Sequence, residues 1–273
     1  MATYQKRLKQ HLTRYRRDRL GVSHCGTFRH KGVDRPYGHI LPRDLRWLNI
    51  PEPFRSEVRG YVSSEERIPL HRYFHHLNSS QAFAFSLFYP YLTLAKGDLA
   101  AALGVASIES WSFEIIPEPD EGTNVDVFLG VRGEAPVYCE VKLSEAGFGK
   151  ARPDARHREK VQNTYRPRLE GKVDPTLLLP ETFCASYQIL RNLWLAAEDP
   201  RASALFLVPK ENEVLSSELA LVLPLVGAEL RARARILFVE DVLTTLTVSG
   251  RVGNGLAWYA ALLREKYVPP AAV

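Results

Sequence analysis

Two short runs of sequence decide the fold of this chain: Asn124-Val125-Asp126-Val127-Phe128-Leu129-Gly130 and Pro136-Val137-Tyr138-Cys139-Glu140-Val141-Lys142. Both are rich in β-branched and aromatic residues, and residues 131–135 between them include a glycine. This pattern is typical of a β-hairpin. With 131–135 as the loop, counting back along both strands sets Asp126 opposite Glu140, where the Cβ atoms of a paired position lie about 4.5–5.5 Å apart.

Alternation along the strands places Asp126, Glu140 and Lys142 on one face of the hairpin. A slip of one residue in the loop would move Glu140 to the other face. Two opposed carboxylates repel each other, so the pair needs a compensating cation. The other face is entirely apolar and is predicted to face a core. Its residues are Val125, Val127, Leu129, Val137, Cys139 and Val141.

The acidic face has two interpretations. Two hard carboxylate oxygens suit Mg²⁺, which prefers octahedral oxygen ligands and keeps several waters. Alternatively, the face is exposed to solvent and Lys142 simply neutralises the two acids. Phe128 and Tyr138 lie on the same face and argue against full exposure, but spacing alone leaves both interpretations open.

The composition is that of an ordinary globular protein. The chain has 273 residues, 45% hydrophobic and 25% charged, enough to bury a sizeable core in one large domain or two small ones. No apolar run approaches the roughly 20 residues that span a bilayer, and the basic N-terminus lacks the apolar region of a secretory signal. Three distant cysteines without a C-x-x-C motif fit a reducing compartment, so we expect a cytoplasmic protein. The glycines form neither a P-loop nor a dinucleotide-binding fingerprint.

Positive charge is concentrated in two segments. Residues 1–35 carry ten Lys/Arg and two acids, and residues 150–172 carry eight Lys/Arg and three acids, although the net charge of the chain is only +5. Two basic segments on an otherwise acidic body indicate a polyanionic partner such as nucleic acid. Ordinary solvated surface segments are the alternative.

The first half of the chain is predicted to form helices that are separated by irregular segments. Residues 4–20 have a sparse apolar stripe among basic residues and predict a helix that docks on the body or lies along DNA. Residues 21–55 are rich in Gly, Pro and His and predict irregular structure. Asn78 is predicted to cap a helix, with Gln81 in the capping-box position. These patterns predict that the chain is divided into a basic N-terminal arm, residues 1–55, and an α/β domain, residues 56–273.

The second half predicts strands at 111–116, 204–208 and 236–240, with an amphipathic helix at 181–197. Residues 148–173 are polar, basic and weakly periodic and predict a mobile loop. Together with the hairpin, the order of elements predicts an α/β fold in which helices flank a mixed central sheet.

This αβββαβ order, with Asp126 and Glu140-Val141-Lys142, resembles the PD-(D/E)xK phosphodiesterase superfamily, the restriction-endonuclease-like fold. The resemblance covers roughly residues 75–240. It implies that Asp126 and Glu140 hold Mg²⁺, for which Mn²⁺ substitutes, with the Val141 carbonyl as a further ligand. Lys142 would orient the attacking water or stabilise charge on the phosphate. Val125 stands where the name of the superfamily has proline.

Other candidates are less constrained by the sequence. Glu114 lies opposite Asp126 if 117–123 form a loop, either as a further metal ligand or as a surface residue in a local salt bridge. The superfamily often presents a Gln or Tyr to the site from the helix after the hairpin, and Gln188 has that position. Arg191 and Asn192 lie on the same face of this helix as Gln188. The alternative is that the three form an ordinary polar stripe with no role in the site. Gln81 is a weaker candidate, since capping already accounts for it.

The sequence therefore predicts a Mg²⁺-dependent DNA endonuclease that hydrolyses phosphodiesters with a metal-activated water. The two basic segments would grip the DNA backbone, and a homodimer is left open as the form that cuts both strands. A nucleic-acid-binding protein on the same fold, without cleavage, is the alternative. It predicts salt-dependent binding and no metal-dependent nicking. An interaction module with an incidental charged hairpin would bind no DNA.

Overall fold

The computed structural model of the chain describes residues 3–64, 68–122, 124–133, 136–249 and 255–271. The chain forms two compact units. Unit 1 comprises residues 1–104 and 240–273, and unit 2 comprises residues 105–239. The expected division into a basic arm, residues 1–55, and an α/β domain, residues 56–273, stays a prediction. Within the described residues, no helix is long and apolar enough to span a membrane.

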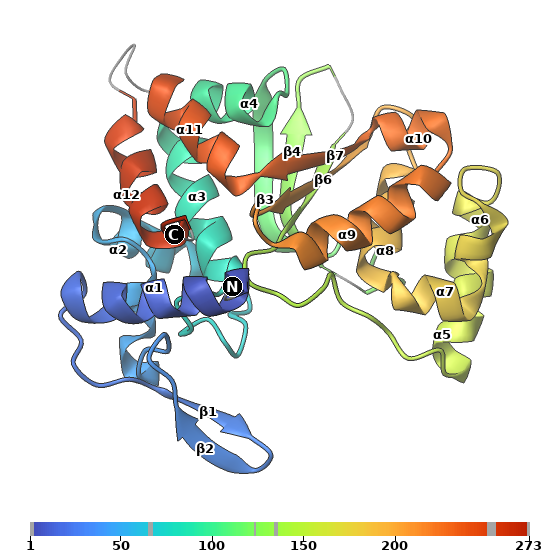
Figure 1. The fold of residues 1–273 in the computed structure, drawn as a ribbon. Coiled ribbons are helices and arrows are strands. Elements are labelled where there is room, and N and C mark those ends of the chain that lie inside the picture. Colours follow the sequence, from blue (N-terminus) through green and yellow to red (C-terminus); the bar gives the residue numbers. More distant parts are fainter. Residues whose placement is uncertain (1–2, 65–67, 123, 134–135, 250–254, 272–273) are drawn as a thin grey trace. The chain divides into compact units, whose positions relative to one another are not determined.

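Unit 1 is mainly helical and carries one small hairpin (Figure 1). Leu8 and Leu12 of its first helix are fully buried, so this basic helix docks on the body of unit 1. The elements of unit 1 are α1 (Tyr4–Asp18), β1 (Thr27–His30), β2 (Val33–Pro36), the 3-10 helix η1 (Arg43–Asn49), α2 (Glu52–Val62), α3 (Ser80–Leu94), α4 (Lys96–Leu103), α11 (Val239–Ser249, which starts in unit 2) and α12 (Ala257–Tyr267).

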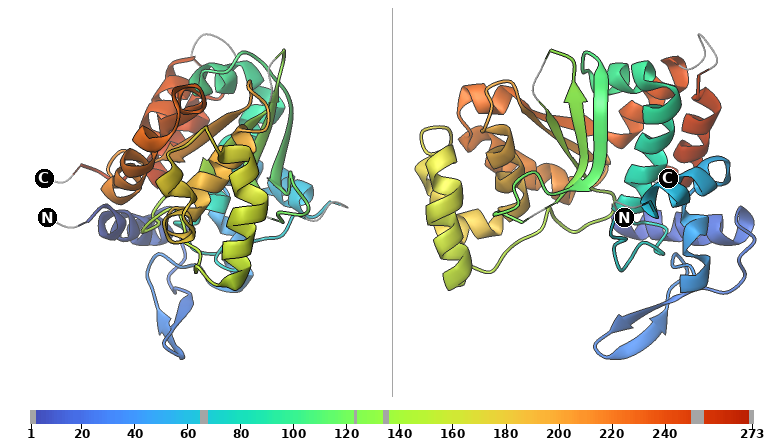
Figure 2. Two further views of the ribbon diagram at one scale, coloured as in Figure 1. Left: turned by 90° about the vertical axis from the view of Figure 1, so that its right-hand side faces the viewer. Right: turned by 180° about the vertical axis from the view of Figure 1, so that it is seen from behind.

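Unit 2 is an α/β unit with a five-stranded mixed sheet and flanking helices (Figure 2). Its elements are β3 (Ile108–Ile115), β4 (Val125–Val131), β5 (Val137–Val141), α5 (Ala155–Lys160), the π-helix η2 (Val161–Tyr165), α6 (Arg166–Leu169), the 3-10 helix η3 (Pro175–Leu178), α7 (Pro180–Ala185), α8 (Tyr187–Ala196), β6 (Ser203–Val208), α9 (Glu213–Val222), the 3-10 helix η4 (Leu223–Leu225), α10 (Ala228–Ala232) and β7 (Ala234–Phe238).

The sheet has the order β3-β4-β5-β6-β7. Strands β3, β4 and β5 form an antiparallel meander, whereas β6 runs parallel to β5, and β7 runs parallel to β6. Strand β5 is therefore the middle strand and all five of its residues are buried. A middle strand that is covered on both faces keeps even its polar side chains away from water.

The core of unit 2 lies between one face of this sheet and the helices that follow β5. Tyr138 and Phe206 from the sheet pack with Leu190 of α8 and Leu219 of α9 in one cluster of buried residues. The predicted apolar face of the hairpin is also confirmed as buried, since Val127, for example, has no exposed surface. On the acidic face the residues of β5 are buried and those of β4 are partly covered, which excludes the fully exposed face that the sequence leaves open.

The predicted loop 148–173 is wrong in large part, because its residues 155–169 form α5, η2 and α6. Val161, Tyr165 and Leu169 are fully buried at successive four-residue intervals. This spacing is the signal of a helix that buries a narrow stripe. The many cations between these residues hide the pattern in the sequence.

Three other expectations need correction. The cap of α3 is Ser79, whose side chain accepts a hydrogen bond from the Ala82 N–H, and not Asn78. The single helix expected at 181–197 is broken at Ser186 into α7 and α8. Residues 21–55, expected to be irregular, contain the β1–β2 hairpin, η1 and the start of α2.

Candidate functional site

The central hairpin has the predicted register. Strands β4 and β5 pair Val127 with Cys139 and Leu129 with Val137. The same register places Asp126 opposite Glu140, and the Asp126 Oδ2 atom accepts a hydrogen bond of 2.8 Å from the Val141 N–H. Residues 134 and 135 of the predicted loop lie outside the described residues. Because the loop length sets the register, the two carboxylates meet on one face of the sheet, as predicted.

Asp126 lies in an environment that disfavours its charge. Burial raises its pKa well above the ordinary value, and the Glu140 carboxylate raises it further. Lys142 and the Val141 N–H act in the opposite direction and do not compensate. Besides burial, two carboxylates, Glu140 and Glu114, and one ammonium, Lys142, act on Asp126, so a further cation would favour its charged form.

Glu140 has both carboxylate oxygens engaged. Its side chain is buried, 1% exposed, and its Oε1 atom lies 2.5 Å from the Lys142 Nζ atom. Its Oε2 atom accepts a hydrogen bond of 2.9 Å from Asn192 Nδ2. Each carboxylate oxygen has two lone pairs, so these bonds fix the orientation of Glu140 and still leave acceptor positions.

Lys142 supplies the cation that the two acids require. Burial by itself lowers its pKa, but Glu140 and Asp126, with help from Glu145, raise it more, so the pKa lies above the ordinary lysine value. The ammonium group therefore stays charged at neutral pH and partly balances the buried carboxylates.

Glu114 is brought beside this pair. Strand β3 pairs Phe113 with Val127 and Ile115 with Val125, and this register puts Glu114 opposite Asp126 as predicted. Its carboxylate raises the pKa of Asp126 and accepts a hydrogen bond from the Asn124 amide. The backbone of Glu114 has a φ of 53°, a left-handed conformation that is strained for a non-glycine residue. Such strain is often retained at functional sites.

The helix α8 contributes residues of different kinds. Gln188 lies against Gly149, where an added Cβ would come within 2.8 Å of its Oε1 atom. No described hydrogen bond joins the Gln188 side chain to either carboxylate. Arg191 is buried and donates to the Asn124 carbonyl at 2.9 Å. Gln81, in unit 1, donates to the Pro69 carbonyl, so its amide is used locally.

Asn192 is the residue of α8 that reaches the pair, although the sequence favoured Gln188 one turn earlier. It is fully buried, and its Oδ1 atom has no hydrogen-bond partner among the described residues. Asn192 is the one uncharged polar residue in the mainly apolar run 189–195, and this was the signal that could have identified it. A buried amide usually has a specific partner, and this one holds Glu140.

Asn192→Ala is expected to destabilise the protein by about 1–3 kcal/mol, because Glu140 Oε2 then loses its buried donor. Urea denaturation measures this difference. The exposed Asn163, in η2, is a matched control whose replacement by alanine should stay within about 0.5 kcal/mol. Equal stability of the two variants would contradict the role given to Asn192.

The donor set has the chemistry of a magnesium site of the open kind. Among the described residues, no group of three or more His, Cys, Asp or Glu side chains is placed to hold a metal ion. Asp126 and Glu140 thus form a two-carboxylate set. Mg²⁺ commonly binds to one or two carboxylates and fills its other positions with waters and substrate phosphates. The surplus charge around Asp126 fits such an ion.

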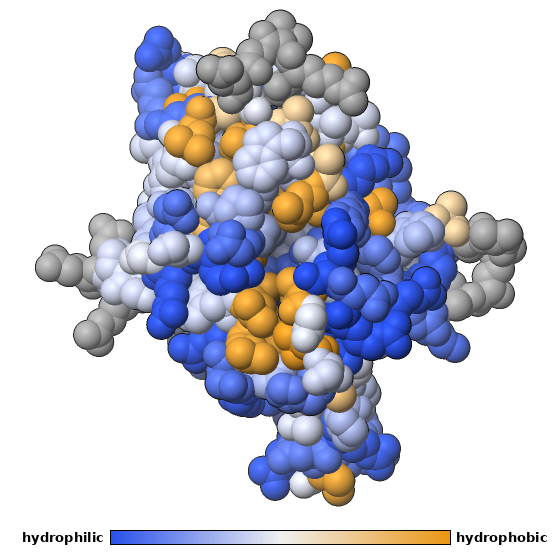
Figure 3. All heavy atoms as spheres, turned by 90° about the vertical axis from the view of Figure 1, so that its left-hand side faces the viewer, coloured by the Kyte–Doolittle hydropathy of each residue, from blue (hydrophilic) through white to orange (hydrophobic). Residues whose placement is uncertain are grey.

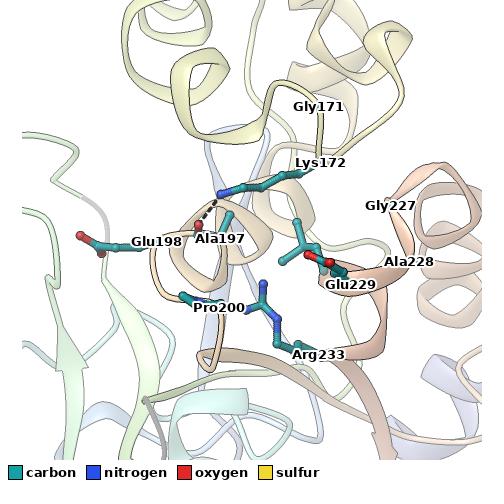
Figure 4. Close-up of a pocket in the computed structure, with 10 residues that line it drawn as sticks. Gly171, Lys172, Ala197, Glu198, Pro200, Gly227, Ala228, Glu229 and Arg233 are labelled. Carbon is teal, nitrogen blue, oxygen red and sulfur yellow. Dashed lines mark hydrogen bonds between the residues drawn. The ribbon is translucent and has the colours of Figure 1, made fainter.

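A hollow of about 420 Å³ lies elsewhere in unit 2, at the end of α8 (Figure 4). Lys172 donates to the Ala197 carbonyl at 2.7 Å, and Arg233 donates to the Ala196 carbonyl at 2.6 Å. Cations bonded to the last carbonyls of a helix stabilise its negative end. The donors of this hollow are thus occupied in capping α8, and it is not the site of the acidic pair.

The fold and these residues define an α/β protein with a buried carboxylate–lysine cluster on the middle strand of a mixed sheet. The chain belongs to the family described as Restriction Endonuclease associating with ARP, whose model matches residues 9–268. Searches among curated proteins and among solved structures give no significant match. The restriction-endonuclease-like family expected from the hairpin motif is therefore supported.

Proposed function

We propose that this protein is a Mg²⁺-dependent DNA endonuclease with a site of the PD-(D/E)xK type, able to use Mn²⁺ in place of Mg²⁺. The observation that carries the proposal is the set Asp126, Glu140 and Lys142 at adjacent strands, in which Glu140 is buried against Lys142 and both act on the charge of the partly covered Asp126. Membership of a restriction-endonuclease family supports the same activity.

The sheet topology also favours a restriction-endonuclease-like core. The acidic pair lies at β4 and β5, the second and third strands of an antiparallel meander, and the chain then forms helices before the parallel strand β6. This is the αβββαβ order that the resemblance implies. Carboxylates at this point of the sheet are fixed by strand pairing, which holds a site more rigidly than a loop does.

Asp126 and Glu140 would hold the ion, with the Val141 carbonyl as a further oxygen ligand, and Glu114 would add negative charge beside them. Bound Mg²⁺ would lower the pKa of a water molecule and neutralise charge on the scissile phosphate. Glu140 is kept in place for this role by Asn192. Lys142 would donate a hydrogen bond to the attacking water or to the phosphate oxygen on which charge develops.

Contact with the DNA backbone is expected mainly from unit 1. Most cations of residues 150–172 already have partners in the protein. Lys160 pairs with Glu121 at 2.9 Å, and Arg168 pairs with Glu118 at 3.2 Å. By contrast, α1 presents exposed cations at Lys6, Lys9 and Arg14. Unpaired surface cations release more counterions from DNA than cations already neutralised.

Incubation with supercoiled plasmid DNA tests the proposal. Nicked or linear product is expected with Mg²⁺ or Mn²⁺ and none with a chelator, because the two carboxylates alone supply no activated water. Metal binding is followed separately, as a rise in melting temperature on addition of Mg²⁺.

The alternative of a binding protein on the same fold predicts a different result. It requires DNA binding that weakens with salt, without any metal-dependent product. That outcome would reject the nuclease and retain DNA as partner. Gel filtration of the protein with and without DNA would decide whether a homodimer forms.

A further inference from the structure

The β1–β2 hairpin of unit 1 is exposed to an unusual degree for a paired element. Every residue of β2 is exposed, and in β1 only Phe28 is even partly covered. The two strands pair in regular antiparallel register, from Thr27 with Pro36 to His30 with Val33. An isolated two-stranded ribbon is at best marginally stable in water. The exposed tip of this hairpin therefore adds little to the stability of the protein.

The root of this hairpin is firmly held. Phe28 packs against the rings of Tyr73 and His76, with centroids 5.5 and 5.9 Å away. The buried guanidinium of Arg16, on α1, donates hydrogen bonds to carbonyls on both sides of the hairpin, at His24 before it and Gly38 after it. The ribbon is therefore fixed at its base and free at its tip, which is the geometry of a pre-oriented contact element.

The turn at the tip carries a cation where the backbone favours a different residue. Lys31 and Gly32 have φ values of 49° and 80°. Positive φ at both central positions is the pattern of a type I′ turn, which favours Asn, Asp or Gly at the first of them. Lysine is strained at this position, so the geometry of the turn does not account for it. The Arg29 Nε atom donates to the Gly32 carbonyl at 3.2 Å, which places this second cation beside the turn.

The charge of the ribbon is complementary to a polyanion. Residues 27–36 contain Arg29, Lys31 and Arg35 and a single acid, Asp34. Figure 3 shows that the segment that projects at the bottom of this view is mainly hydrophilic. The hairpin root lies beside α1, because Gly38 is in contact with Thr13 of that helix, and α1 carries exposed cations of its own. The ribbon and α1 thus belong to one cationic surface of unit 1.

We propose that the β1–β2 hairpin is a recognition ribbon that enters the major groove of duplex DNA. The inference rests on the proposed function, since it takes DNA as the partner. The major groove of B-form DNA, about 12 Å wide, admits a two-stranded β-ribbon, whereas the deep and narrow major groove of A-form RNA does not. Arg29, Lys31 and Arg35 contact phosphates or guanine edges, and the exposed Val33 adds an apolar group of the kind that contacts thymine methyls.

The test neutralises the ribbon without breaking its turn. Glycine at position 31 relieves the strained turn, and glutamine at positions 29 and 35 keeps side-chain length. The hairpin variant is therefore Arg29→Gln, Lys31→Gly and Arg35→Gln. The matched control removes three exposed cations elsewhere: Arg59→Gln, Lys96→Gln and Arg231→Gln. Circular dichroism and melting temperature verify that both variants fold, and Lys31→Gly alone is a milder version that should fold at least as well as the wild type.

Binding to a short B-form DNA duplex is measured against salt concentration, without divalent ions so that no cleavage interferes. Each lost phosphate contact lowers the slope of log affinity against log salt by about 0.9, so the hairpin variant should lose about two to three units of slope and at least about tenfold in affinity. The control should keep the wild-type slope. Double-stranded RNA of the same length is the comparison ligand, on which the hairpin variant and the wild type should differ little.

The outcomes separate this inference from the proposed function. If the wild type binds DNA and the hairpin variant binds it equally well, the ribbon is not a contact and the inference is overturned, while the nuclease proposal stands. An equal loss on DNA and on double-stranded RNA would also overturn entry into the major groove. If the wild type binds no duplex at all, DNA as the partner fails, and the ribbon inference fails with it.

Discussion

Asp126→Asn protein is expected to lose metal-dependent DNA cleavage by about a thousandfold or more while it stays folded. Loss of one carboxylate ligand removes several kcal/mol of charge stabilisation, and about 4 kcal/mol corresponds to a thousandfold in rate. The amide oxygen of asparagine can still accept the hydrogen bond from the Val141 N–H. The cleavage rate on plasmid DNA at saturating Mg²⁺ measures the effect.

The same substitution should not lower stability, and this distinguishes a functional acid from a structural one. Burial and Glu140 raise the pKa of Asp126, so the folded state binds its proton more tightly than the unfolded chain does. Ionised Asp126 therefore costs stability at neutral pH, above its unfolded pKa, and neutral asparagine removes that cost. The melting temperature at pH 7 should be unchanged or higher.

Asp120→Asn is the matched control, since Asp120 is an exposed acid on the connection between β3 and β4. It should leave both cleavage and stability as they are in the wild type. If Asp126→Asn protein cleaves DNA at the rate of this control, the site is assigned to the wrong residues.

Lys142→Met is expected to destabilise the protein strongly as well as to abolish cleavage. Lys142 is the cation next to Glu140, whose side chain is 1% exposed, and removing one partner of a buried ion pair costs about 3–5 kcal/mol. Chemical denaturation at pH 7 measures this loss. Lys150→Met is the control, because Lys150 is exposed, pairs with Glu218 only at 4.0 Å, and should change stability by about 1 kcal/mol or less.

Added Mg²⁺ gives a second measurement on the same variant. Without Lys142, Asp126 and Glu140 lack their neighbouring cation, so Mg²⁺ should raise the melting temperature more in Lys142→Met protein than in the wild type. Lys142→Arg keeps the charge but changes the donor geometry, and it should recover stability without full activity. A Lys142→Met protein as stable as the wild type would refute the charge balance described for this site.

Much of the site follows from local sequence. The register of β4 and β5 depends on a short loop and on alternation with a period of two, and both can be read from residues 124–142. The same reasoning places Glu114 opposite Asp126 across the β3–β4 connection. The hydrophobic periodicity of each segment predicts whether it is a strand or a helix. The order of these elements along the chain then predicts an α/β unit with a mixed sheet.

Other features depend on which segments distant in the chain come together. The helices at 155–169 were missed because three buried residues are outnumbered by cations, and only packing against α7 and α8 shows which face is apolar. Asn192 and Gln188 both lie on α8, and the choice between them depends on the way that this helix rests on β5. The exposed β1–β2 hairpin is likewise held by contacts outside its own residues.

The sequence by itself determined that Asp126, Glu140 and Lys142 share one face of a hairpin, because strand geometry relates spacing to side-chain direction. Only the tertiary structure decided that this face is buried. The reason is that alternation tells which residues lie together but not what covers them. The parallel pairing of β6 beside β5 and the packing of α8 over Glu140 bury that carboxylate, while Asp126 beside it stays partly exposed, and this turns a charged hairpin into a candidate metal site.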